Sequence, residues 1–266
     1  MQDAQAPERF FRWRVCDDDP NAASIFAFSE RPFPKDEKVV VAIPNVIGGK
    51  KVVAIDDCAF FDCRLPTRIE IPESVERIGT IAFLSCSSLM EFNVAPNNTR
   101  YKDENGVLFS KDGEVLTTHP PGRESCVVPK GVKRVGANAF ADGCLLKSIL
   151  LPDGLTHIEE GAFSGCVAID SIDLPTGLKT VGEDAFFHCS SLTAISLPEG
   201  LTKLGDRAFL RCSSLSSVSL PQSLEKIGEN SFDEISDDCV FYVQARSYAC
   251  RWAIENGYDV EIRRRD

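Results

Sequence analysis

Cysteine and histidine are the residues in this chain that could perform metal, redox or nucleophilic chemistry, and there are eleven cysteines and three histidines. A metal or redox centre needs thiolates that converge on one point, as in paired Cys-x-x-Cys motifs. Most of the cysteines instead recur at regular long intervals, as Cys63, Cys86, Cys166, Cys189 and Cys212. The odd total also prevents complete pairing into disulfides. We therefore predict a column of buried free thiols, with no metal site and no cofactor.

His188 lies beside Cys189, which is a candidate pairing of general base and nucleophile. If Cys189 points inward as a member of the column, its neighbour His188 points outward, so the pair cannot act together. His119 and His157 lie far from it in sequence, and the chain contains no Gly-rich phosphate loop, GxSxG elbow or HExxH helix. We predict that the protein is not an enzyme and has no catalytic residues.

Two short polar motifs have ordinary explanations. Asp17, Asp18 and Asp19 lack the ligand alternation and closing glutamate of an EF-hand, which favours a solvated turn over a cation site. The string Asn97-Asn98-Thr99 matches a glycosylation acceptor, a pattern that short sequences meet by chance.

The elements that position these residues come from an internal repeat. Prolines recur every 23 residues at Pro129, Pro152, Pro175, Pro198 and Pro221, and phenylalanines do the same at Phe140, Phe163, Phe186, Phe209 and Phe232. The same frame extends back through Pro72 with Phe83 and through Pro44 with Phe60. Seven units are recognisable, of the form LPxGLxxVGxxAFxxCxxLxxIx.

Each unit contains short apolar clusters separated by Pro, Gly and Ser, too brief for a three-turn helix. The segment 192–198 is typical of a short strand that ends at a proline, and 178–181 of a second extended segment. One such unit cannot bury its own apolar side, but units stacked at a spacing of about 4.8 Å can. The pattern predicts a β-rich solenoid with a parallel sheet along one face.

The repeat unit resembles that of the BspA-like leucine-rich repeat family, which includes the treponemal-type leucine-rich repeat protein, over residues 39–260. The resemblance implies a right-handed leucine-rich repeat solenoid of about seven repeats, capped at both ends. It implies little about function, because the shared letters are the buried ones. Asp56 and Glu159 depart from the pattern by replacing the repeat glycine, so that turn does not need a positive φ in every unit.

The two ends and one interruption complete the expected organisation. Residues 10–15 and 24–28 are typical of a capping hairpin, residues 106–110 and 114–118 flank a Lys-Asp-Gly turn, and residues 239–243 and 247–256 are typical of a final strand and helix. We predict one structural domain with these parts: an N-terminal cap, 1–38; two repeats, 39–94; a hairpin insertion, 95–127; five repeats, 128–238; and a C-terminal cap, 239–266.

Charge and hydropathy narrow the partners. The formal net charge of −11 opposes nucleic-acid binding, and no apolar stretch approaches the roughly 20 residues of a membrane-spanning helix. The first fifteen residues contain no secretory signal pattern, so we expect a cytoplasmic location for the chain as given. A cell-surface or secreted location is the alternative if the chain is a fragment.

We predict a non-catalytic protein-protein interaction module that binds a protein or peptide. The alternatives are an adhesin-like domain that binds a host or matrix protein, and an enzyme whose active site is assembled on the insertion. The expected contact surface is the N-terminal half of the sheet face, beside the insertion. Its candidate residues are Arg68, Glu70, Met90, Glu91, Asn93, Lys147, Leu150, Asp170 and Asp173.

Overall fold

The computed structural model describes residues 8–30 and 38–263, and it divides into two compact units, Met1–Arg123 and Glu124–Asp266. We call these unit 1 and unit 2 and describe each by itself. The boundary falls inside the predicted insertion, so the domain limits proposed from the sequence stay a prediction. The outermost parts of the predicted caps lie outside the described residues. Within those residues no helix is long and apolar enough to cross a membrane.

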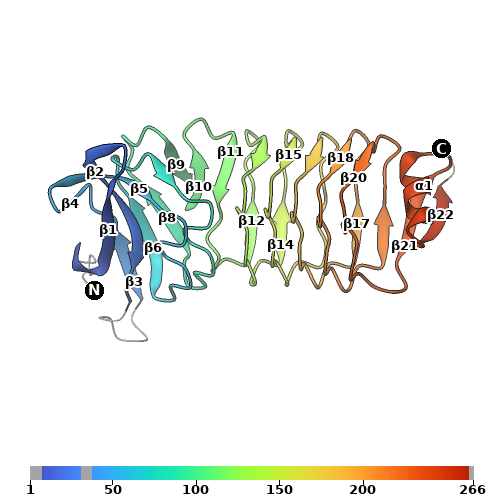
Figure 1. Cartoon of the computed structure of the whole chain (residues 1–266), viewed down its shortest axis with the longest axis horizontal. Coiled ribbons are helices and arrows are strands. Elements are labelled where there is room, and N and C mark those ends of the chain that lie inside the picture. Colours follow the sequence, from blue (N-terminus) through green and yellow to red (C-terminus); the bar gives the residue numbers. More distant parts are fainter. Residues whose placement is uncertain (1–7, 31–37, 264–266) are drawn as a thin grey trace. The chain divides into compact units, whose positions relative to one another are not determined.

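Unit 1 consists of short strands in three small sheets (Figure 1). Its elements are η1 (Glu8–Phe10), β1 (Phe11–Cys16), β2 (Asp19–Phe28), β3 (Val39–Ala42), β4 (Val46–Ile47), β5 (Lys50–Ile55), β6 (Pro66–Ile71), β7 (Arg77–Ile78), β8 (Glu91–Val94), β9 (Tyr101–Glu104), β10 (Val107–Ser110) and β11 (Val115–Thr118). The repeat strands β3, β6 and β8 pair in parallel, as predicted.

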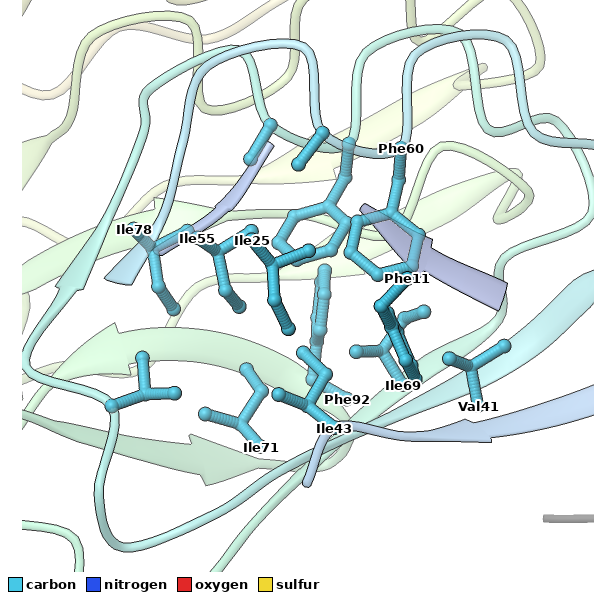
Figure 2. Packing of buried hydrophobic residues seen from close by; sticks show 14 of the residues in the cluster. Phe11, Ile25, Val41, Ile43, Ile55, Phe60, Ile69, Ile71, Ile78 and Phe92 are labelled. Atoms are coloured by element: carbon cyan, nitrogen blue, oxygen red, sulfur yellow. The ribbon is translucent and has the colours of Figure 1, made fainter. Parts of the chain in front are cut away.

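The N-terminal hairpin predicted from the sequence is present and continues the stack of repeats. β1 and β2 are antiparallel, and β2 pairs in parallel with β5 of the first repeat. The Phe28 ring stacks on Phe60 with 5.2 Å between centroids, and Phe60 lies 5.2 Å from Phe83. Figure 2 shows Phe60 among the buried isoleucines of this core. The hairpin therefore caps the first coil by imitating a preceding one.

The predicted insertion hairpin is also present, as antiparallel β10 and β11, with β9 as a third strand that the sequence reasoning missed. Asn98 explains how the chain enters it. Its buried side chain donates from Nδ2 to the carbonyls of Pro72 and Val75, and its Oδ1 accepts from the amides of Arg100 and Tyr101. Asn98 thus has a structural role that the glycosylation motif does not describe.

Unit 2 contains two ladders of parallel strands, one of longer strands and one of two-residue strands (Figure 1). Its elements are β12 (Ser125–Val127), β13 (Arg134–Val135), β14 (Ser148–Leu150), β15 (His157–Ile158), β16 (Thr180–Val181), β17 (Ala194–Ser196), β18 (Lys203–Leu204), β19 (Ser217–Ser219), β20 (Lys226–Ile227), β21 (Val240–Gln244), α1 (Tyr248–Glu255) and β22 (Asp259–Arg263). The short ladder runs β13-β15-β16-β18-β20.

The longer ladder corrects the expectation of one continuous parallel sheet. It consists of β12-β14 and of β17-β19-β21-β22, and the coil between β14 and β17 has no strand at residues 171–173. Asp170 and Asp173 flank this segment, and aspartate is disfavoured in strands. The face of unit 2 is therefore interrupted at one coil.

Phenylalanine stacking runs through the core of unit 2. Ring centroids lie 5.1 Å apart between Phe163 and Phe186 and 5.0 Å apart between Phe186 and Phe209, with nearly parallel planes. The turn that carries each phenylalanine is held by two residues in the left-handed region, such as Asp184 and His188 around Phe186. The sequence reasoning missed both positions, because only one of the five coils of unit 2 uses glycine there, at Gly161 and Gly165.

The repeat glycines are needed for space and not for a positive φ. A Cβ at Gly205 would lie 2.4 Å from the amide nitrogen of Glu183, and one at Gly228 would lie 2.3 Å from that of Asp206. Neither glycine has a positive φ, in agreement with the inference from Asp56 and Glu159. The backbones of successive coils approach so closely here that a side chain would separate them.

The C-terminal cap has the predicted strand and helix, with β22 added. The Ser247 hydroxyl accepts from the amide of Cys250 at the start of α1, and Gly257 follows its end with φ +79°. Trp252 packs 5.7 Å from Phe232 and thereby closes the phenylalanine stack. It is an anchor of the cap, as the sequence indicated.

Replacing Phe186 by alanine is expected to lower the free energy of unfolding by about 3–5 kcal/mol, because the cavity would lie in the middle of the stack. Phe187→Ala is the matched control, since that neighbouring ring is only half-buried. Urea unfolding of both variants measures the difference. Equal losses would contradict the assignment of Phe186 to the core.

Gly205→Ala is expected to destabilise the protein by about 1–3 kcal/mol, because its methyl group would overlap the backbone of the preceding coil. Gly131→Ala should be neutral or slightly stabilising, since no atom lies within 4 Å of a Cβ built there. Melting temperatures of the pair provide the measurement. A harmless Gly205→Ala would show that the coils are not in close contact.

Candidate functional site

The cysteine column is built as a hydrogen-bonded part of the core. Each of its thiols in the regular coils donates to the carbonyl of the phenylalanine 26 residues earlier, for example Cys86 Sγ to Phe60 at 3.0 Å and Cys212 Sγ to Phe186 at 3.1 Å. Burial raises the pKa of Cys86 to about 12, whereas a reactive thiol needs a lowered pKa. All eleven cysteines are free thiols in this structure. The column stabilises the fold and is not arranged for redox chemistry.

The other residues that could do chemistry are also separated or engaged. His188 is exposed in the left-handed region while Cys189 is buried, so the two side chains lie on opposite sides of the chain. Asp19 accepts from the amide of Asn21 within the β1-β2 turn. Across residues 8–30 and 38–263, no group of three His, Cys, Asp or Glu side chains is placed to hold a metal ion.

Native thiol labelling checks this assignment. At pH 8, iodoacetamide should modify the exposed Cys58 and Cys144 first, and the column cysteines only after denaturation. Because the pKa of Cys86 rises from 9.0 unfolded to about 12 folded, its contribution to stability is present below pH 9.0 and lost as pH rises toward 12. Urea midpoints should therefore fall above pH 9.0. Rapid native labelling of Cys189 would contradict the buried column.

The predicted contact residues of unit 1 lie on two neighbouring strands. Arg68 and Glu70 of β6 are in register with Glu91 and Asn93 of β8. Arg68 and Glu91 form an ion pair across the two strands, so their charges are largely used within the surface. Met90, just before β8, is 46% exposed. This surface is a mixed one whose apolar contribution comes from Met90.

The predicted residues of unit 2 lie around β14. Lys147 forms an ion pair of 2.9 Å with Glu124, and the side chain of Leu150 is 62% exposed. Leu150 is directly in register with Val127 of β12, which is 73% exposed. The sequence reasoning assigned Val127 to the insertion and missed it, although it stands 23 residues before Leu150 in the repeat frame. Together these residues form an exposed apolar pair, the Val127-Leu150 patch.

Asp170 and Asp173 lie on the strandless coil beside that patch, and both are exposed. Asp170 Oδ1 accepts from the Ser171 hydroxyl at 2.8 Å. The structure thus divides the predicted contact residues between two units, and whether they bind a partner stays a prediction.

Beyond Asp173, the face of unit 2 is hollowed. The sequence predicts a featureless, solvent-facing stretch here, at Thr193, Ala194, Ser196, Ser216, Ser217 and Ser219. Instead a hollow of about 430 Å³ is lined by Ser171, Ile172, Asp173, Leu174, Thr176, Ala194, Ile195, Ser196, Pro198, Ser217, Ser219 and Arg263. Ser219 is only 7% exposed, which corrects the prediction that it faces solvent. It is paired with the much larger Tyr242 of β21, on whose ring the Arg263 guanidinium lies at 5.3 Å.

Part of this hollow could have been found from the sequence. Tyr242 follows Ser219 by 23 residues, so the repeat frame places a large side chain beside a small one. Arg263 could not have been found in this way, because it lies on β22, outside the repeat.

Comparisons with solved structures show the fold. A pneumococcal vaccine antigen, PcpA, matches with a TM-score of 0.69 at 22% identity, covering 86% of this chain and 62% of that chain. A leucine rich cell surface protein from Faecalibacterium prausnitzii A2-165 matches with a TM-score of 0.67 at 27% identity, covering 85% and 63%. A leucine-rich repeat protein from Eubacterium ventriosum matches with a TM-score of 0.53 at 22% identity, covering 85% and 91%.

This chain therefore spans about three fifths of the length of the first two structures. No curated protein matches it. The model of the BspA type leucine rich repeat region matches six copies, over residues 40–107 and 122–237. The stacked 23-residue coils, the phenylalanine and cysteine ladders and this match agree, and the chain belongs to the BspA-type leucine-rich repeat family.

Proposed function

We propose that this chain is a non-catalytic module that binds a protein or peptide through the sheet face of its repeats. The observation that carries the proposal is the Val127-Leu150 patch of unit 2. Both side chains project from paired strands, so the scaffold holds them in place before any partner arrives. Interface cores are apolar and preorganised surfaces lose little entropy on binding, which makes this pair a suitable anchor.

The surroundings of the patch match the anatomy of an interface. Glu124 and Lys147 form an ion pair at one side, and Asp173 occupies the next coil in the same row. A polar rim of this kind excludes water from an apolar centre once a partner is bound. The patch is small, so further contacts from the same face would be needed for a stable complex.

The absence of catalysis has two supports. The family is typically non-catalytic. Cys189 and His188, the candidate nucleophile and base, lie on opposite sides of the chain, so a proton could not pass between them. An active site assembled on the insertion has no support from Asn98 and Tyr101, which are engaged in backbone hydrogen bonds.

An adhesin-like domain at the bacterial cell surface is the second candidate. It is favoured by the 27% identity to the F. prausnitzii cell surface protein, of which this chain spans 63%. In that case the same face would bind a host or matrix protein. A cytoplasmic location for the chain as given stays the alternative prediction, and the binding surface proposed is the same for both.

Affinity capture with charge-reversed surfaces tests the proposal. The immobilised chain is exposed to extracts of the source organism and to matrix proteins, and bound proteins are identified by mass spectrometry. The double variant Val127→Asp, Leu150→Asp should lose at least tenfold of the captured protein, because two carboxylates cannot enter an apolar contact. Thr193→Asp with Ser216→Asp is the control, since it adds the same charge to exposed positions elsewhere on the face.

Melting temperatures of both double variants should stay close to that of the unaltered chain, because all four positions are exposed. Met90→Asp is a separate arm that reports on the unit 1 surface. A captured protein that is lost with Met90→Asp and kept with the unit 2 variant would move the site to unit 1. Equal capture by every variant would refute binding through the sheet face.

A further inference from the structure

We infer that the hollow between Asp173 and Arg263 in unit 2 is a binding site for a short, neutral carbohydrate. This site is separate from the Val127-Leu150 patch and does not depend on it. The lining combines a recess, hydroxyl groups, one carboxylate and one guanidinium within a single repeat face.

The recess follows from the alternation of side chains along β17 and β19. Ile195 and Val218 point inward and are buried, so their neighbours project from the face. Those neighbours are small, namely Ala194, Ser196, Ser217 and Ser219. Larger elements stand on the Arg263 side, and the floor between the walls is left low. The volume of about 430 Å³ is within the usual range of about 300–1,000 Å³ for small-ligand sites.

Ser219 shows that the hollow has an unmet need for a polar ligand. Its side chain lines the hollow and is 93% buried, as the complement of its 7% exposure. Within the part of the chain that the structure describes, its hydroxyl has no hydrogen bond. A buried hydroxyl without a partner costs free energy, and a ligand hydroxyl would supply the missing bond.

The two walls supply opposite hydrogen-bonding roles. Asp173 is exposed and offers acceptors, while the Arg263 guanidinium offers several donors and is held over the Tyr242 ring. Serine and threonine hydroxyls on the floor can both donate and accept. A ligand that is rich in hydroxyls and has no net charge satisfies all of these groups at once.

Other ligand classes fit less well. A polyanion would meet the repelling carboxylates of Asp170 and Asp173 as well as the single arginine. A peptide or protein would need an apolar pocket for an anchor, but the apolar residues of the lining, Ile172 and Ile195, are buried. The hollow therefore favours a sugar, and peptide binding becomes an outcome of the test.

The experiment screens the full chain against an array of neutral oligosaccharides that includes malto-, cello-, xylo-, manno-, galacto- and chito-oligosaccharides, and confirms hits by saturation-transfer NMR. At least one neutral oligosaccharide should bind. Ser196→Trp should abolish that binding by filling the hollow, and Ser216→Trp, an exposed serine outside the lining, should leave it unchanged. Asp173→Asn and Arg263→Ala should each weaken it at least fivefold.

Ser219→Ala separates a ligand-binding role from a structural one. Because the hydroxyl has no partner in the free protein, its removal should leave the melting temperature unchanged or raise it, while carbohydrate binding weakens. A clear loss of stability would show that the hydroxyl is already satisfied, and would overturn the inference. So would the absence of binding across the array, equal binding by Ser196→Trp, or a preference for sulfated oligosaccharides or for peptides.

Discussion

Every feature of this protein depends on the contact between a residue and its counterpart in the next coil. Phe186 lies 5.0 Å from Phe209, and Gly205 permits the backbone of one coil to touch that of the coil before. Such a contact is satisfied only when both coils have the same length, because one extra residue would turn each buried side chain away from its counterpart. The constant 23-residue period is therefore a packing requirement, and the buried ladders are its result.

A stack held together in this way leaves hydrogen-bonding groups unmatched at the end of each ladder. The structure resolves this with tyrosine hydroxyls. Tyr101 accepts from the amide of Ile78 beside the last short strand of unit 1, and Tyr248 accepts from that of Ile227 in unit 2. Tyr258 donates to the carbonyl of Phe232 from 26 residues away, the place that a column cysteine would otherwise occupy. The caps thus complete both the apolar stack and the polar ladders, which leaves no open edge at those points.

The same constraint separates structure from recognition. Inward positions must repeat, so Phe, Cys and Gly carry no information about a ligand. Outward positions are free to vary, and their variation produces the exposed Val127-Leu150 patch and the hollow beside Arg263 on one face. Both sites are made by neighbouring coils that differ in side-chain size, on a scaffold whose backbone is the same.

The sequence by itself determined the period, the buried phenylalanine and cysteine columns, the two caps and the insertion hairpin, because each of these follows from spacing and local turn chemistry. It could not show that Asp184 and His188 adopt the left-handed region, since neither is glycine. It also failed at Ser219, which is counted as exposed by strand alternation but is buried because Arg263, outside the repeat, lies over the neighbouring Tyr242. Only the tertiary structure could decide such cases, because burial of an outward residue depends on side chains from elements that the repeat frame does not include.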